Sequence, residues 1–207
     1  MQRLSLTDQV AQAVRGEILG GALAPGASLR EQVLAARFEV GRSTVREAIK
    51  VLVAEGLVTQ AHHRGAIVTR HTAADVDDLI AARSMIERHV ATADLGDTTA
   101  AAEALEAMRR AVDAGDTQAG AEADEAFHRA VVQAAGSPRI TAFHSQLAGE
   151  LRLLLVSADR AQPEPDKVAE HTRLLELLRA GDREGYLAAA LHHVARARDT
   201  LVRVAGA

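Results

Sequence analysis

The chain has 207 residues, which suits one large domain or two small ones. Hydrophobic residues make up 48% of it and aromatic residues only 2%, a composition that favours closely packed helices over a sandwich of strands. Because the sequence contains no cysteine, disulfides and thiolate metal sites are excluded. It shows no apolar run of roughly 18 residues, as a membrane span requires, and no signal peptide after Met1, so we expect a cytoplasmic protein that does not enter a membrane.

The formal net charge of −4 is distributed unevenly along the chain. Residues 1–70 contain 9 lysines and arginines against 6 acidic residues, whereas residues 71–207 contain 15 against 22. A basic head, residues 1–70, is therefore followed by an acidic body, residues 71–207. Any surface that binds phosphate groups is expected within residues 1–70.

Residues 1–70 have the pattern of three helices followed by a hairpin. Ser5 and Asp8 form a capping box before a run of apolar residues at helical spacing, which ends at Gly20. A tight bend is expected at 39–41. The predicted elements are helices over 5–20, 31–37 and 42–55, and strands over 57–59 and 66–69.

After Arg70 the β-prone runs stop and only helical patterns follow. Thr72 and Asp75 form a second capping box. Glycine, proline and aspartate mark helix breaks at 95–97, 114–116, 136–138, 162–165 and 180–182. We therefore predict a mainly α protein with an N-terminal helix-turn-helix domain over 1–70 and an all-α bundle of about six helices over 71–207.

The bend near residue 40 and the helix after it have helix-turn-helix form, in which the second helix lies in the major groove of DNA. Arg42 and Arg46 stand one turn apart on one helix face, so both can reach the same DNA surface. Ser43 and Thr44 add short hydrogen-bond donors beside them. The alternative interpretation is that these arginines only form a solvated surface.

Further basic and flexible positions flank this helix. Arg30 precedes the second predicted helix, and Arg64 and Gly65 lie at the tip of the hairpin, where they can contact phosphate or the minor groove. The unit contains the stretches Leu23-Ala24-Pro25-Gly26-Ala27-Ser28-Leu29-Arg30-Glu31, Leu34-Ala35, Val40-Gly41-Arg42-Ser43-Thr44-Val45-Arg46-Glu47-Ala48-Ile49, Leu52-x-x-Glu55-Gly56-Leu57-Val58 and Arg64-Gly65-Ala66-x-Val68. Through these stretches it closely resembles the winged helix-turn-helix of the GntR family.

That resemblance implies that Arg30, Arg42, Arg46 and Gly65 match the family's DNA-contacting positions. The sequence departs from the commonest pattern at Gly41, where serine is frequent, and at Thr44, where proline is frequent. Both departures can alter operator preference without affecting the fold.

Four groups that bind transition metals fall on the inner faces of three predicted helices. Asp124 and His128 are spaced i, i+4, which places a carboxylate and an imidazole on one helix face. His171 and His193 lie on the apolar stripes of the last two helices and therefore point inward. The neighbouring His192 falls on a polar face and is expected to be exposed.

The turn at Gly181 brings two of these histidines level. His171 lies ten residues before it and His193 twelve after it, so at about 1.5 Å per residue an antiparallel helix pair places them level to within about 3 Å. Three imidazoles and a carboxylate suit a divalent transition metal, for which we expect zinc first, with nickel and manganese as alternatives. The other interpretation is that each histidine is a hydrogen-bonded core residue.

Residues 75–205 contain the motifs Arg83-x-x-x-Glu87, Asp124-x-x-Phe127-His128, Glu170-His171 followed by Ala180-Gly181-Asp182, and His193. Through these motifs this part of the chain resembles the FCD ligand-binding domain of the FadR-type branch of the GntR family. In metal-binding members of that branch one aspartate and three histidines hold the ion, so the resemblance implies Asp124, His128, His171 and His193 as the ligands. The sequence departs at Ser137-Pro138, where an asparagine commonly follows the glycine.

Arg83 shares an apolar stripe with Leu79, Ile86 and Val90, so its charge faces the interior of the bundle. An inward arginine is costly unless it is paired. One interpretation is an i, i+4 ion pair with Glu87. The other is that Arg83 binds the carboxylate of an organic-acid effector whose other oxygens complete the metal's coordination.

Together these patterns predict a homodimeric, ligand-responsive DNA-binding transcription regulator, which we expect to be a repressor and not an enzyme. Two heads related by a two-fold axis would read a palindromic operator, and a small organic acid would change the affinity for it. A metal-dependent enzyme and a constitutive DNA binder with a structural metal are the alternatives. A catalytic metal centre needs a positioned base or nucleophile, and no motif supplies one.

Overall fold

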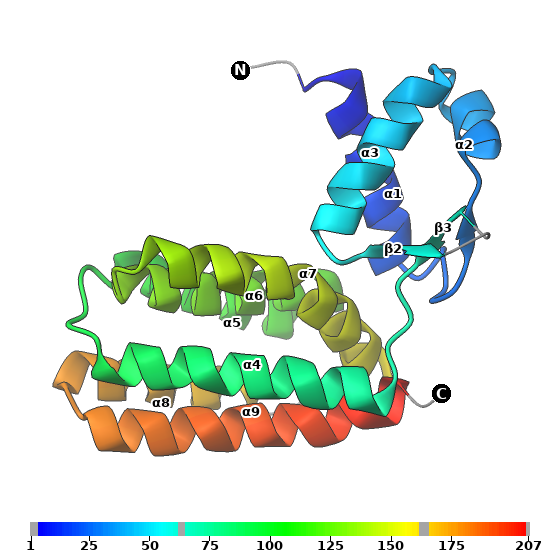
Figure 1. Ribbon diagram of the computed structural model, residues 1–207. Helices are drawn as coiled ribbons and strands as arrows, with labels where there is room; N and C mark the ends of the chain where they lie inside the picture. The colour runs from blue at the N-terminus through cyan, green and yellow to red at the C-terminus, as the bar shows by residue number, and fades with distance from the viewer. Residues whose placement is uncertain (1–3, 62–64, 162–165, 206–207) are drawn as a thin grey trace. The chain divides into compact units, whose positions relative to one another are not determined.

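The computed structural model describes residues 4–61, 65–161 and 166–205 (Figure 1). Residue contacts divide the chain into two compact units, one formed by residues 1–70 with 146–153 and the other by residues 71–145 with 154–207. The mainly α fold predicted from the sequence is confirmed. Among the described residues, no helix is both long enough and apolar enough to cross a membrane.

The first unit begins with three helices close to the predicted positions: α1 (Leu6–Leu19), α2 (Glu31–Phe38) and α3 (Arg42–Ala54). The capping box before α1 is present, because the Ser5 hydroxyl accepts the Asp8 N–H and the Asp8 carboxylate accepts the Ser5 N–H. Helix α3 presents Val45 and Leu52, both fully buried, to the core of this unit. The apolar spacing along the chain therefore accounts for the face that α3 buries.

The bend between α2 and α3 depends on one residue with an unusual backbone conformation. Glu39 ends α2 with φ 55° and ψ 39°, in the left-handed region, and its N–H bonds to the carbonyl of Ala35. This is the usual way to end a helix abruptly, but glycine is the residue that adopts it without strain. The bend directs the chain into α3 at Arg42.

A small antiparallel sheet completes the first unit. Its strands are β1 (Ser28–Leu29), β2 (Val58–Ala61) and β3 (Gly65–Val68), in the order β1-β3-β2. Ile67 of β3 is level with Ser28 of β1 and with Thr59 of β2. The hairpin β2–β3 was predicted. The strand β1 was not, because two residues are too few to show the alternation that marks a strand.

The other helices are α4 (Ala73–Thr92), α5 (Thr99–Ala114), α6 (Thr117–Ala134), α7 (Pro138–Ala161), α8 (Lys167–Ala180) and α9 (Arg183–Ala205). In the second unit α4 lies beside α9, α5 beside α6, and α8 beside both α5 and α9 (Figure 1). Four of the five predicted breaks separate these helices as expected, and the fifth, 162–165, lies outside the described residues. Thr72 and Asp75 form the predicted capping box of α4.

Small side chains allow close contact between helices in the bundle, while a few large ones fill its centre. Ala101, Ala121 and Ala190 are almost completely buried, as are Phe127 and Tyr186. Gly181 ends α8 with φ 70°, a conformation that suits glycine. The chain then reverses into α9, so residues on either side of this turn lie opposite each other.

Candidate metal centre and DNA-binding surface

The N-terminal end of α3 presents most of the predicted DNA-contacting side chains to solvent. Arg42, Ser43 and Arg46 are exposed and Thr44 is half-buried. The first turn of this helix has unpaired backbone N–H groups, and Arg42 and Arg46 lie one turn apart beside them, so this end of the helix is suited to phosphate and base edges.

Arg46 is held in place by an acidic partner that sequence reasoning missed. Its Nε and Nη2 atoms donate to the two carboxylate oxygens of Glu31 on α2, at 2.9 and 2.8 Å. The Arg46 side chain is 57% exposed, so the pair lies at the surface. The two hydrogen bonds hold the guanidinium in one orientation. Nothing local in the sequence signals a pair that joins two helices.

The remaining predicted DNA contacts lie around this helix. Arg30 is exposed at the start of α2, where it is the N-cap residue. Gly65 is exposed at the start of β3 with φ 74°. Arg64 lies outside the described residues.

In the second unit, three histidines from three helices come together. His128 of α6, His171 of α8 and His193 of α9 each offer a ring nitrogen, and these nitrogens all lie within 4.8 Å of one another. The His171 and His193 rings have centroids 4.7 Å apart, in agreement with the level expected from the Gly181 turn. His171 is fully buried and His128 is 6% exposed. His192 is exposed, as predicted.

Hydrogen bonds on the outer side of the cluster fix which ring nitrogens carry protons. His171 Nδ1 lies 2.7 Å from the backbone carbonyl of Lys167, and His193 Nδ1 lies 2.9 Å from a carboxylate oxygen of Glu170. Both partners can only accept, so both Nδ1 atoms must donate. In a neutral ring the Nε2 atom then carries a lone pair, which is the form that binds a metal. Arg196 pairs with the same Glu170 carboxylate and holds it in position.

Asp124 borders the cluster. Its Oδ1 atom lies 3.2 Å from His171 Nε2 and 3.6 Å from Lys167 Nζ. Burial raises the pKa of Asp124, but the positive charge of Lys167 lowers it, and the net result is a pKa well below its usual range. Asp124 is therefore an ionised carboxylate inside the bundle.

The ring nitrogens at the centre of the cluster face one another. His171 Nε2 lies 3.1 Å from His128 Nε2 as well as 3.2 Å from Asp124 Oδ1. Burial, together with the positive charge of Arg83, lowers the pKa of His128 well below its usual range, so this ring is neutral. A buried meeting point of imidazole nitrogens and a carboxylate oxygen is what a divalent transition metal requires, and the residues present fit such an ion.

Arg83 takes part in a buried network close to this centre. Its Nε donates to Glu87 at 2.8 Å, and its Nη1 donates to His144 Nε2 at 2.9 Å. Tyr186 donates its hydroxyl to the same Glu87, and burial together with that carboxylate raises the pKa of the tyrosine well above its usual range. The predicted ion pair of Arg83 with Glu87 is therefore present.

Two buried donors of the network have no hydrogen-bond partner among the described residues: Arg83 Nη2 and His144 Nδ1. Because His144 Nε2 accepts from Arg83, its Nδ1 carries the proton. Burial and the charge of Arg83 lower the pKa of His144 to about 3, so the ring stays neutral. Such donors are rare in protein interiors, and each of them can donate to a water or to another hydrogen-bond acceptor. His144 has no sequence motif that could have revealed this role.

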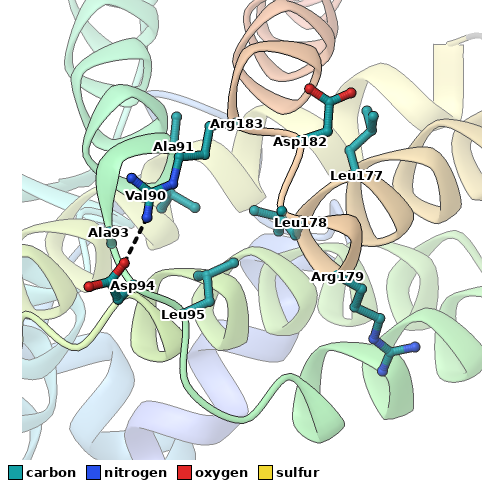
Figure 2. Close-up of a pocket in the computed structure, with 11 residues that line it drawn as sticks. Val90, Ala91, Ala93, Asp94, Leu95, Leu177, Leu178, Arg179, Asp182 and Arg183 are labelled. Carbon is teal, nitrogen blue, oxygen red and sulfur yellow. Dashed lines mark hydrogen bonds and ion pairs between the residues drawn. The ribbon is translucent and has the colours of Figure 1, made fainter.

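A separate pocket of about 300 Å³ lies where α4 and α8 end and α9 begins (Figure 2). Arg183 bonds to Asp94 across it at 2.7 Å, and their side chains are 58% and 99% exposed. None of the clustered histidines lines this pocket. Its charged groups already have solvent and each other as partners, so we assign it no ligand.

Two protein-family models match the chain. Residues 6–68 match the bacterial regulatory proteins of the gntR family, and residues 78–196 match the FCD domain. A D-xylose utilization operon transcriptional repressor of Paenarthrobacter nicotinovorans, described as probable, is 31% identical over 199 residues, which cover 94% of this chain and 88% of that protein. The HTH-type regulator BphR of Paraburkholderia xenovorans is 41% identical over 83 residues, which cover 40% of this chain and only 34% of that regulator.

The likeness extends to solved structures. A GntR transcriptional regulator from Rhodococcus sp. RHA1 superposes with a TM-score of 0.83 and 29% identity, and the match covers 95% of this chain and 97% of that one. Both family models, the full-length relative and this structure agree with one another. The chain therefore belongs to the GntR family of bacterial transcriptional regulators and contains an FCD domain.

Proposed function

We propose that this regulator is a ligand-responsive repressor whose affinity for operator DNA is changed by a small carboxylate bound beside a divalent metal. The observation that carries the proposal is the buried cluster of His128, His171 and His193 near Arg83, which retains an unpartnered donor. It acts in the cytoplasm as a homodimer. A two-fold dimer presents two copies of α3 and reads a palindromic site.

The head reads DNA through the exposed end of α3. Arg42 and Arg46 provide guanidinium groups for guanine or phosphate, and Ser43 and Thr44 provide short donors. Arg30 and Gly65 contact the flanking backbone. The pair of Arg46 with Glu31 supports this role, because an oriented guanidinium loses less freedom when DNA binds.

The three histidines would hold the ion through their Nε2 atoms, joined by the Asp124 carboxylate. Glu170 and the carbonyl of Lys167 orient His193 and His171 from outside. Zinc suits these nitrogen and oxygen donors best, with nickel and manganese as alternatives. When bound, the ion would supply a positive centre with open positions for an anionic oxygen.

The effector is anionic because the unpartnered buried donors near the centre demand an acceptor. Arg83 Nη2 is a charged donor and His144 Nδ1 a neutral one. A carboxylate can accept from either donor and also offer an oxygen to the ion. Binding would satisfy groups that are costly to leave unpaired in the interior.

The metal content of the purified protein tests whether the histidine cluster binds an ion. The wild type is expected to carry about one divalent ion per chain, and His171→Ala is expected to lose most of it. His192→Ala is the matched control, since this neighbouring histidine is exposed, and should retain wild-type occupancy. A wild type that takes up no metal after incubation with zinc, nickel or manganese would remove the metal from the proposal.

A second experiment distinguishes a metal that takes part in regulation from a metal that is purely structural. An operator is selected from random-sequence duplexes, and its affinity is measured for the metal-loaded protein with and without each member of a panel of mono- and dicarboxylates. The proposal expects at least one acid to weaken operator binding. Operator affinity that no acid alters would make the protein a constitutive DNA binder.

A further inference from the structure

Lys167 is a buried lysine whose ammonium group lies beside the centre. It is the first residue of α8, its side chain is 6% exposed, and its Nζ lies 3.6 Å from Asp124 Oδ1. Lysine is almost never this deeply buried without a partner of opposite charge. The Asp124 carboxylate is such a partner.

The same carboxylate is the one that the proposed metal requires. The nitrogens of the three histidines are mutually within 4.8 Å, whereas Asp124 meets the cluster at His171 and faces the lysine as well. An ammonium and a metal ion are both cations, so they compete for one anion.

We infer that Lys167 is a resident cation that competes with the metal for Asp124 and thereby sets the metal affinity of the centre. This inference rests on the proposed metal site. With the ammonium present, the Asp124–Lys167 pair has no net charge, and an incoming ion must weaken an existing ion pair. Without it, the ion meets an uncompensated carboxylate in a medium of low dielectric, where attraction is strong. By weakening metal binding, the lysine would allow the ion to bind reversibly.

The ammonium group of Lys167 contacts Asp124, whereas its backbone carbonyl contacts His171, so the two roles can be tested separately. The backbone carbonyl orients His171, and a side-chain substitution leaves that carbonyl in place. Lys167→Met keeps most of the apolar stem and removes only the charge. Lys167→Arg keeps the charge and is the matched control.

The experiment titrates each variant with Zn²⁺ against a chelator of known affinity. Lys167→Met is expected to bind Zn²⁺ at least about tenfold more tightly than the wild type, and Lys167→Arg within about threefold of it. In the Asp124→Asn background the same methionine substitution should change the affinity much less, because the contested carboxylate is gone. Metal-free Lys167→Met should melt at a lower temperature than the wild type, and Zn²⁺ should restore much of the difference.

The same measurements distinguish failure of the Lys167 inference from failure of the proposed metal site. Equal or weaker Zn²⁺ binding by Lys167→Met, with a wild type that does bind, overturns the role of Lys167 and leaves the metal site intact. A wild type that binds no Zn²⁺, Ni²⁺ or Mn²⁺ overturns both. If Lys167→Met does not fold without metal, Lys167→Gln replaces it, and the same affinities decide the question.

Discussion

Replacing Glu87 with glutamine tests how much the buried ion pair of Arg83 with Glu87 contributes to the stability of the fold. The Arg83 and Glu87 side chains are 8% and 2% exposed, and the Glu87 carboxylate also accepts the Tyr186 hydroxyl. Glutamine has almost the same shape, but it has no negative charge and it replaces one of the two accepting oxygens with an NH2 donor. The guanidinium of Arg83 is then left in the interior without a counter-ion.

The expected cost is large because burial prevents solvent from taking over the role of the carboxylate. Removing one partner of a buried ion pair costs about 3 to 5 kcal/mol, which is a substantial part of the roughly 5 to 15 kcal/mol that stabilises a typical domain. For a chain of this size the loss corresponds to a decrease in Tm of roughly 6 to 20 °C.

A matched pair on another helix provides the control. Glu125 and Arg129 have the same i, i+4 spacing and an N–O distance of 3.0 Å, but the Arg129 side chain is 46% exposed. Glu125→Gln should therefore cost no more than about 0.5 kcal/mol. Urea unfolding of both variants with EDTA present measures the difference. Similar losses for Glu87→Gln and Glu125→Gln would refute the argument from burial.

Three further outcomes follow from the structure. Glu39→Gly should raise the free energy of unfolding by about 0.5 to 1 kcal/mol in urea titrations, because glycine adopts the left-handed conformation at this bend without strain. Arg46→Ala should weaken specific operator binding about ten- to a hundredfold in mobility-shift titrations while Arg198→Ala, on α9, leaves it unchanged. Burial lowers the pKa of His144 to about 3, so the unfolded chain takes up this proton below pH 6.5 and the folded chain does not until about pH 3. Stability should therefore decrease by up to about 1.4 kcal/mol per pH unit as the pH falls through that window, and His144→Phe, unlike His192→Phe, should reduce this slope in metal-free protein.

Helix positions could be predicted because their signals are local. The capping boxes at Ser5 and Thr72 and the break at Gly181 lie within a few residues of the boundaries they set. The approach of His171 to His193 was also predictable, since a short turn joins their helices and fixes the register. Periodicity and turn chemistry therefore yielded both the fold and part of the site.

Contacts between distant segments could not be predicted in this way. Glu31 reaches Arg46 from another helix, and His144 lies 61 residues from Arg83. No sequence pattern marks Lys167, and only the tertiary structure shows that it is buried beside Asp124. Each of these pairs depends on how helices pack, which periodicity alone does not determine.

The central claim is that the carboxylate site and the operator site are coupled, and calorimetry tests it most directly. The metal-loaded protein is titrated with the carboxylate that binds it best, once alone and once saturated with the selected operator. The account predicts that the two affinities differ by about 5- to 150-fold, with weaker binding when operator is present, because the effect of each ligand on the other is reciprocal. Equal affinities with and without operator would contradict it.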